Sequence, residues 1–323
     1  MRTPLLILCA LLGACKGGNN YASMAKSANA ARSDAGSTEV MPAPPGATLL
    51  GSGQNAPRGI QVEGDSVFWF NEGGRAVGTP GLFKLPRGGG PVVALMPGAD
   101  LMAMAADATS VYWLAPRAGK VGKVPRGGGA PEVLAETTSI VRGMVIDDTD
   151  IFWAEDEAVY RVSKAGGKVQ TVVAAGLPDY LAIDGTHVYW YSILAGVIYR
   201  APKKGGAAAK VYADDQHTFH TFFVDGPDLF VTFGSEKKLQ IQRLPKSGGK
   251  PVTVVEGQDP GPAFAIDGTH VYWITEDDLF KVPRAGGSAT KLVAKLEHGR
   301  DLTVDDQFVY WLDRSGRVQK MPK

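Results

Sequence analysis

The nine residues AIDGTHVYW occur twice in this chain, at positions 182–190 and again at 265–273. They belong to a longer repeat, because every tryptophan ends a word of the form VYW, VFW or IFW. These tryptophans are about 40 residues apart, and they are Trp69, Trp113, Trp153, Trp190, Trp273 and Trp311. The single gap of double length contains a degenerate copy, DGPDLFV, with Val231 in the place of tryptophan. A fixed period of this length predicts seven copies of one structural unit rather than two copies of a catalytic motif.

Each copy contains four short apolar runs, which in the sixth copy read AFAID, HVYWIT, LFKVP and ATKLVA. These runs are rich in β-branched and aromatic residues with polar residues between them, a pattern typical of β-strands. Asp-Gly separates the first two runs and predicts a tight hairpin. Lys/Arg-x-Gly-Gly separates the last two runs, where glycine allows the positive φ that such turns need.

Four antiparallel strands per copy and seven copies predict an all-β, seven-bladed β-propeller. The seventh copy stops after three runs, at VQKMPK (318–323), and the missing outer run appears near the start as ATLLGSG (47–53). We therefore expect the N-terminal strand to pair with the C-terminal blade, which closes the ring and removes an exposed sheet edge.

The chain begins with a stretch typical of a secretory signal peptide, MRTPLLILCALLGAC (1–15), which has a basic start and an apolar run. Its end, LGAC, resembles the lipobox of bacterial lipoproteins, which implies cleavage before Cys15 and acylation of that cysteine. Lys16 follows Cys15, and by resemblance to the sorting rule of some Gram-negative bacteria this favours the outer membrane. An ordinary signal peptide with a chance cysteine is the alternative.

Residues 16–46 are rich in Gly, Ala, Ser, Asn and Pro and predict a flexible tether. Residues 47–323 then form the propeller, and the expected location is the cell envelope, on its periplasmic or surface-facing side. The anchor is the expected contact with the membrane, since no second apolar run is long enough to cross it.

Charge and cysteine content narrow the possible partners. The chain has 34 basic and 33 acidic residues, a formal net charge of +1, so no global field draws it to nucleic acid. Cys9 lies in the signal peptide and Cys15 would be acylated, which leaves no thiol for a disulfide, a nucleophile or a metal site. We expect a monomer with no cofactor and no metal.

The VYW words and the Gly-Gly hairpins resemble the YWTD repeats of LDL-receptor class B propellers, and also bacterial propellers of the NHL type. The resemblance covers all seven copies, but the Thr-Asp of YWTD is absent: Tyr-Ser follows Trp190 and Leu-Asp follows Trp311. The resemblance implies a propeller that binds partners, and it assigns no catalytic residue to this chain.

Candidate binding residues lie where the chain enters each innermost strand. We compare the seven copies at the two positions that lie ten and eleven residues before the tryptophan position. Some copies have small residues there, and others have polar residues. Because these polar residues do not follow the repeat, we expect them to converge on the mouth of a central channel as a ligand site: Arg58, Arg142, Asp179, Tyr180, His220, Arg300 and Asp301. Ring closure would bring Arg58 and Arg300 together, and paired guanidiniums suit a carboxylate or phosphate. The alternative is that these arginines pair internally with Asp301 and Asp179.

Two other sets of charged residues are weaker candidates for a functional site. A pair of histidines, His217 and His220, stands beside Asp214 and Asp215, but residues three apart on a strand point to opposite faces, which disfavours a metal site. The basic residues of the short turns could form a rim that touches phosphates, or could simply be balanced by the nearby Asp turns: Arg87, Arg126, Lys203, Lys246 and Arg284.

The sequence thus predicts an envelope-anchored lipoprotein whose propeller binds a protein or glycan at the channel mouth. The alternative is a propeller lyase or hydrolase, in which His220 would be a general base and an arginine the oxyanion partner. The motifs G-x-S-x-G, H-E-x-x-H and the P-loop are absent from the sequence. A single histidine in the predicted site favours binding over catalysis.

Overall fold

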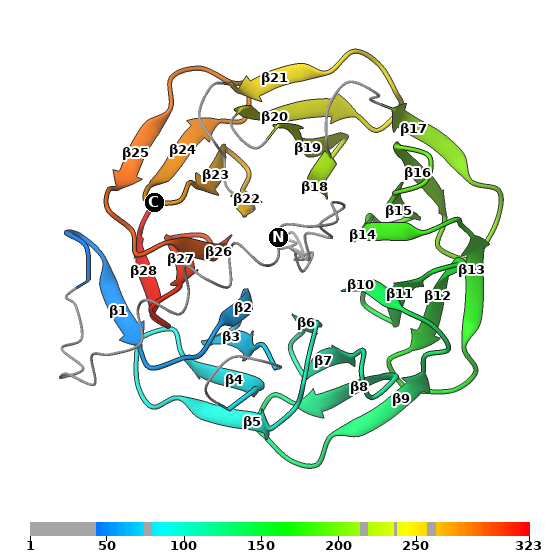
Figure 1. Ribbon diagram of the computed structural model, residues 1–323, viewed down its shortest axis with the longest axis horizontal. Helices are drawn as coiled ribbons and strands as arrows, with labels where there is room; N and C mark the ends of the chain where they lie inside the picture. The colour runs from blue at the N-terminus through cyan, green and yellow to red at the C-terminus, as the bar shows by residue number, and fades with distance from the viewer. Residues whose placement is uncertain (1–42, 74–78, 214–218, 236–237, 257–262) are drawn as a thin grey trace, which may run out of the picture.

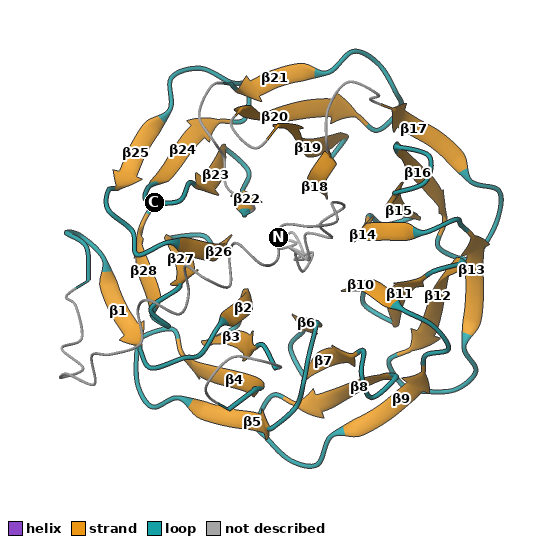
Figure 2. Cartoon of the chain, in the orientation of Figure 1, coloured by secondary structure: helices purple, strands orange, loops and turns teal. Residues whose placement is uncertain are grey.

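A computed structural model describes residues 43–73, 79–213, 219–235, 238–256 and 263–323. In this part of the chain, 28 strands form seven antiparallel sheets of four strands each, and no helix is present. The sheets are arranged in a ring, with one strand of each sheet innermost (Figures 1 and 2). The predicted seven-bladed β-propeller is therefore confirmed.

The strands follow the four apolar runs of each repeat, from the inside of the ring outward. Blade 1 contains β2 (Pro57–Glu63), β3 (Ser66–Asn71), β4 (Gly81–Pro86) and β5 (Val93–Pro97). Blade 2 contains β6 (Ala103–Ala106), β7 (Ser110–Ala115), β8 (Lys120–Pro125) and β9 (Glu132–Glu136). Blade 3 contains β10 (Val141–Ile146), β11 (Asp150–Glu155), β12 (Ala158–Ser163) and β13 (Gln170–Ala174). Blade 4 contains β14 (Pro178–Ile183), β15 (His187–Ser192), β16 (Val197–Pro202) and β17 (Ala209–Ala213).

The remaining blades have the same order. Blade 5 contains β18 (Phe219–Asp225), β19 (Asp228–Ser235), β20 (Lys238–Pro245) and β21 (Val252–Val255). Blade 6 contains β22 (Phe264–Ile266), β23 (His270–Ile274), β24 (Leu279–Pro283) and β25 (Thr290–Val293). Blade 7 contains β26 (Gly299–Val304), β27 (Phe308–Asp313) and β28 (Val318–Pro322), and its outermost strand is β1 (Thr48–Gly51).

Strand β1 closes the ring as predicted. It pairs antiparallel with β28, so the first and last strands of the chain lie side by side at the lower left of Figure 1. Leu50 of β1 is buried in an apolar cluster with Trp69 of blade 1 and Tyr310 of blade 7. The closing strand thus contributes both backbone pairing and core.

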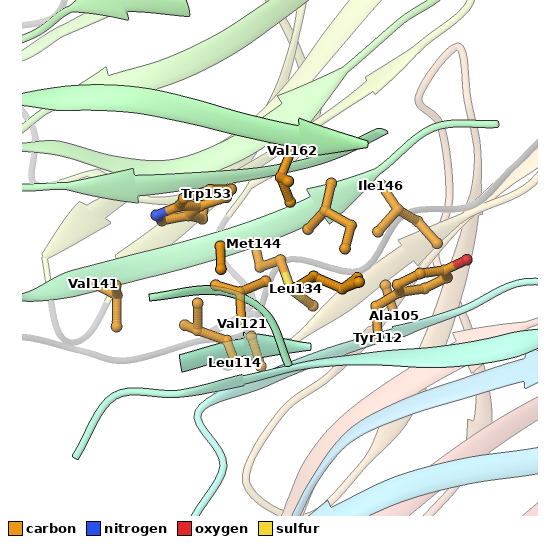
Figure 3. Close-up of a cluster of buried hydrophobic side chains, with 13 residues drawn as sticks. Ala105, Tyr112, Leu114, Val121, Leu134, Val141, Met144, Ile146, Trp153 and Val162 are labelled. Atoms are coloured by element: carbon orange, nitrogen blue, oxygen red, sulfur yellow. The ribbon is translucent and has the colours of Figure 1, made fainter. Parts of the chain in front are cut away.

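The hydrophobic core is divided among the contacts between blades. Each of the seven apolar clusters found in the described residues lies between two neighbouring blades. In the cluster of Figure 3, Tyr112 and Leu114 of blade 2 pack against Met144 and Trp153 of blade 3. Because each blade buries its two faces against its two neighbours, no blade has an independent core.

The hairpin between the first two strands of a blade forms as predicted, and at Gly226 the Asp-Gly turn uses a positive φ of 56°. In blade 4, Gly185 of the Asp-Gly turn does not have a positive φ, so glycine is not required there. The turn is instead held by Asp184, whose Oδ1 accepts backbone N–H groups of Thr186 and His187, both at 2.8 Å. An Asp side chain that bonds the backbone two and three residues on is a turn-forming device in itself.

The prediction for the other turn is confirmed. In the Lys/Arg-x-Gly-Gly turns both glycines have positive φ, for example 91° at Gly89 and 144° at Gly90. A residue with a side chain adopts such angles only with strain.

The turn aspartates and the turn cations form a ring of ion pairs on the face of these short turns, called here the turn face. The cation that follows the third strand of each blade pairs with the turn aspartate of the preceding blade. In the described residues the ring has seven pairs: Arg126–Asp65, Lys164–Asp107, Lys203–Asp147, Lys246–Asp184, Arg284–Asp225, Lys323–Asp267 and Arg87–Asp305. The turn cations are therefore paired with turn aspartates and do not form a free basic rim, the second of the two alternatives given in the sequence analysis. Each of these aspartates belongs to the neighbouring blade.

The tyrosine of VYW completes the same network. Tyr189 donates its hydroxyl to Oδ2 of Asp184 at 2.8 Å, and Nζ of Lys246 donates to the same oxygen at 2.6 Å. Burial opposes ionisation of Asp184, but the hydrogen bonds from Lys246 and the turn amides hold its pKa well below its usual range. The duplicated nonapeptide thus encodes an inner strand, its turn and the acceptor for the next blade's lysine.

Candidate functional site

The seven predicted site residues lie near the beginnings of five innermost strands, namely β2, β10, β14, β18 and β26. These strand beginnings are on the side of the ring opposite the turn face, where each second strand leads to the third; we call this side the mouth face. The structure does not bring all seven residues together. It places them in three groups, at the boundary of blades 7 and 1, at the boundary of blades 3 and 4, and on blade 5.

The first group joins Arg58 and Arg300 as predicted. Nε of Arg58 is 3.1 Å from Oε1 of Glu72, and Nη1 of Arg300 is 4.0 Å from Oε2 of the same carboxylate. Burial and the charge of Arg58, with a further contribution from Arg314, lower the pKa of Arg300, whereas Glu72 acts in the opposite direction. Arg58, Arg300, Arg314 and Glu72 are called here the arginine cluster. Arg58 and Arg300 share the carboxylate of Glu72, and Arg314 adds a third positive charge that acts on Arg300.

Arg300 is poorly paired for an arginine of this burial. Its Nε and Nη1 are inaccessible to solvent, and neither has a hydrogen-bond partner in the part of the chain that the structure describes. A buried donor without a partner is costly, because it has lost its water and gained nothing in exchange. Such exceptions in a folded protein call for an explanation, and a missing ligand is one.

The second group is arranged differently, although it starts from the same repeat position. Nε and Nη2 of Arg142 donate to Oδ1 of Asp156 at 3.2 and 2.9 Å. Asp156 stands 14 residues after Arg142, and Glu72 stands 14 residues after Arg58. At the corresponding place in blade 7, 14 residues after Arg300, the residue is Arg314. Arg300 therefore lacks the acidic partner that its own blade would otherwise supply.

The predicted aspartates have another role than pairing with the arginines. Oδ2 of Asp301 accepts the backbone N–H of Gly59 at 2.8 Å, and its Oδ1 accepts that of Leu302 at 2.9 Å. Gly59 has a φ of 65°, and a Cβ there would be 2.5 Å from the ring of Phe70, so this close approach requires glycine.

The carboxylates that accept hydrogen bonds from the arginines are Glu72 and Asp156. The internal pairing considered from the sequence is present only as charge interactions, of Arg58 with Asp301 and of Arg142 with Asp179.

Both buried aspartates have raised pKa values. Burial raises the pKa of Asp301 to about 6, against the hydrogen bond from Gly59 and the charge of Arg58. Burial likewise raises the pKa of Asp179 to about 6, against its hydrogen bond with the N–H of Tyr180 and the charge of Arg142. Carboxyl groups with such values change charge near neutral pH, which is a property often found at functional sites.

Tyr180 contacts blade 5, and His220 contacts its own blade. The Tyr180 ring is buried and packs edge-on against Phe219, with ring centroids 5.2 Å apart. Nε2 of His220 is 3.4 Å from the carbonyl oxygen of Gly234. Within the described residues, no hydrogen bond or ion pair joins His220 to Arg58, Arg142 or Arg300.

A small cavity adjoins the arginine cluster, between blades 1 and 2. Its volume is about 190 Å³, and Arg58, Glu72 and Asp301 contribute to its wall. The other lining residues are Gly59, Phe70, Gly73, Asp100, Leu101, Met102, Pro116 and Arg117. Sequence reasoning missed Glu72, Asp100 and Arg117, which lie in connections between strands; the repeated spacing of 14 residues could have identified Glu72.

A metal site finds no support in the part of the chain that is described, since no group of three or more His, Cys, Asp or Glu side chains converges there. The sequence cluster with His217, Asp214 and Asp215 lies outside the described residues. No apolar helix long enough to cross a membrane occurs between residue 43 and the C-terminus, as far as the structure describes that stretch.

Comparison with known proteins gives the fold. No family model matches the chain, and no curated protein matches it. Among solved structures it is similar to virginiamycin B lyase from Staphylococcus aureus, in a catalytically inactive variant with quinupristin, at 13% identity and a TM-score of 0.68. That match covers 86% of this chain and 98% of the lyase chain. A streptogramin B lyase structure matches at 12% identity and a TM-score of 0.64, covering 85% of this chain and 96% of that one.

A binding protein is also among the similar structures. A chain of a nidogen–laminin complex matches at 15% identity and a TM-score of 0.50, covering 64% of this chain and 90% of that chain. The fold is therefore shared with lyases and with a chain that assembles with a partner. Identities this low establish the propeller fold and leave activity to be argued from the site.

Proposed function

We propose that this protein is a lipid-anchored binding module of the cell envelope, which holds an acidic group of a protein or glycan at the mouth face. The observation that carries the proposal is Arg300, whose Nε and Nη1 are buried without a hydrogen-bond partner in the described residues. An acidic ligand would supply the hydrogen bonds and the charge that Arg314 cannot supply.

The electrostatics of the arginine cluster support this choice of ligand. The charges of Arg58 and Arg314 both act on Arg300, and the carboxylate beside Arg300 is that of Glu72, which Arg58 also uses. The local excess of positive charge is not part of a global field, since the chain as a whole has a net charge of only +1. Guanidinium groups offer planar pairs of donors that fit a carboxylate or a phosphate.

The similarity to propeller lyases raises catalysis as the alternative. The described mouth residues favour binding, because the imidazole of His220 lies beside the carbonyl oxygen of Gly234 on blade 5. A general base must be within hydrogen-bond reach of the proton it removes, and the arginine cluster lies on other blades.

The binding half of the proposal is tested by capture from envelope extract with immobilised residues 47–323. We expect the wild type to capture a protein or glycan that Arg300→Gln fails to capture. Arg142→Gln is the matched control, because Arg142 occupies the same repeat position and already has its own carboxylate. Equal capture by the wild type and Arg300→Gln would show that the arginine cluster is not the binding site.

The anchor is tested separately. Residues 1–42 lie outside the described part of the structure, so the anchor rests on the sequence, in which Cys15 ends an LGAC word. Two acyl chains hold a protein on a membrane without a spanning helix. We expect the wild-type chain to partition into detergent and Cys15→Ser to remain in the aqueous phase. Unchanged partitioning of Cys15→Ser would contradict a lipid anchor.

A further inference from the structure

The cavity beside the arginine cluster has a chemistry of its own. Phe70, Leu101, Met102 and Pro116 form an apolar part of its wall, and Phe70 and Leu101 are almost fully buried in the core beneath. Arg58 and Glu72 belong both to this cavity and to the arginine cluster. A ligand in the cavity would therefore meet apolar surface and guanidinium donors together.

We propose that this cavity takes the C-terminal residue of a peptide chain, with the terminal carboxylate on the arginine cluster and an apolar side chain in the cavity. The inference rests on the proposed function and narrows it from acidic ligands in general to peptides. Capture of a terminal carboxylate by convergent donors is a recurring mode of peptide recognition.

Size and polarity favour a peptide terminus over an acidic sugar. A volume of about 190 Å³ is below the ~300–1,000 Å³ of sites that enclose whole small molecules, and it suits one residue rather than an oligosaccharide. The lining also contains charged side chains, but its part formed by Phe70, Met102 and Pro116 offers no polar side-chain atom to the hydroxyl groups of a sugar ring, which would need hydrogen-bond partners. An apolar side chain such as leucine needs none.

The guanidinium of Arg300 can adapt to such a ligand. Its Nη1 is 4.0 Å from Glu72, and in the described part of the chain no hydrogen bond fixes the group in place. It can therefore turn toward a carboxylate beside Arg58 without breaking an existing bond. Arg58 differs, since its Nε already donates to Glu72 at 3.1 Å.

An ion pair also contributes to the wall of the cavity. Nη1 of Arg117 donates to Oδ2 of Asp100 at 2.7 Å, and both residues line the cavity. This pair stands at an exposed edge, since the Arg117 side chain is 71% exposed. Its polar groups suit the backbone amides of a peptide that leaves the cavity toward solvent.

The experiment is a calorimetric titration of the chain from residue 16 onward with four probes. These are N-acetyl-Ala-Leu with a free carboxylate, the same dipeptide with a C-terminal amide, N-acetyl-Ala-Gly with a free carboxylate, and glucuronic acid. We expect the leucine acid to bind, and the amide to bind at least about tenfold more weakly, because it lacks the charge that the arginines recognise. The glycine acid should also bind about tenfold more weakly, since it leaves the apolar wall uncovered.

Variants of the chain distinguish the contribution of the arginine cluster from that of the apolar wall. Arg300→Gln should lower the affinity for the leucine acid about tenfold or more, whereas Arg142→Gln should leave it unchanged. Met102→Ala should lower the affinity for the leucine acid more than that for the glycine acid, because it removes part of the apolar wall and adds no charge beside the cluster.

Each other outcome has a definite meaning. Equal binding of the leucine acid and its amide would overturn the inference. Glucuronic acid binding as tightly as the leucine acid, with loss in Arg300→Gln, would also overturn it while leaving an acidic-ligand site in place. If none of the carboxylate probes and no inorganic phosphate binds, the inference and the proposed site both fail.

Discussion

At the residue scale, the repeated motif is explained by one carboxylate. Asp184 accepts two turn amides, the Tyr189 hydroxyl and the Lys246 ammonium group. The same arrangement recurs at Asp267, with Tyr272 and Lys323 as donors. The two identical nonapeptides are therefore alike because each Asp and Tyr has the same set of partners, and not because they share a chemical activity.

Removing this carboxylate should destabilise the fold, whereas changing the glycine beside it should not. We expect Asp184→Ala to lower the free energy of unfolding by about 2–4 kcal/mol, because Lys246 and the turn amides lose a charged acceptor. Gly185→Ala is the matched control: its φ is not positive, and in the described structure a Cβ there meets nothing within 4 Å. Thermal and denaturant unfolding measure both changes. Equal losses in the two variants would contradict a turn that depends on the aspartate and not on the glycine.

The buried carboxyls of Asp179 and Asp301 predict how stability depends on pH. Burial raises each pKa from its ordinary value of 3.8 to about 6 in the folded protein. Between these values the folded protein binds more protons than the unfolded chain, so stability falls as pH rises from about 4 to about 7 and changes little above that.

The expected loss over this range is at most about 3 kcal/mol per carboxyl. Asp301→Asn removes one of the two contributions, so its stability should depend less on pH than that of the wild type. Denaturant unfolding at pH 4.5, 6 and 7.5 measures the effect. A wild type and an Asp301→Asn variant with parallel pH profiles would contradict the assignment to Asp301.

At the scale of strands and blades, the sequence predicted most of the architecture. Strand positions, blade number and the closing strand β1 could be predicted because the core depends on a repeated apolar pattern, which is visible in one sequence. The site could be predicted only in part. Arg58 and Arg300 meet as expected, but their shared partner Glu72 lies in a connection after β3 that does not follow the apolar repeat.

The ion-pair ring of the turn face also shows what the sequence alone could not predict. Its cations and aspartates were visible as repeated turn residues, yet each pair joins two blades, for example Lys246 of blade 5 and Asp184 of blade 4. Repetition along the chain explains a turn, but it does not say which neighbour the turn residue contacts. That depends on how the sheets pack around the ring.

The closing strand provides a prediction at this scale. We expect Leu50→Ala to lower the free energy of unfolding by about 2–4 kcal/mol, because Leu50 of β1 is 6% exposed and packs with residues of blades 7 and 1. Thr48→Ala on the same strand is exposed and should change stability by less than about 0.5 kcal/mol. Denaturant unfolding compares them. A Leu50→Ala variant as stable as the wild type would show that ring closure does not depend on β1 packing.

At the scale of the whole molecule, the two faces of the ring differ in how their charges are satisfied. On the turn face, each described ring cation has an aspartate of the neighbouring blade, and the pairs follow the repeat around the molecule. On the mouth face, the charged groups depart from the repeat, and Arg300 remains poorly paired. The ion pairs of the turn face therefore join neighbouring blades around the ring, whereas the pairing of Arg300 on the mouth face is incomplete, as the proposed ligand site requires.

This difference predicts opposite effects of the same substitution at two positions. Arg300→Met should raise the free energy of unfolding by about 1–3 kcal/mol, because it removes buried unpaired donors and the repulsion from Arg58, and keeps apolar volume. Arg142→Met should lower the free energy of unfolding by about 1–2 kcal/mol, because it leaves Asp156 without its hydrogen-bonded cation and Asp179 without a nearby positive charge.

Denaturant unfolding of both variants at pH 7 measures the contrast, and capture from envelope extract by the same two proteins completes it. Arg300→Met should be more stable than the wild type and fail to bind, whereas Arg142→Met should be less stable and still bind. Such a pair of results would separate a residue kept for its ligand from one kept for the fold. Loss of stability in Arg300→Met would mean instead that the arginine stabilises the fold. The proposal of a ligand at the arginine cluster would then fail.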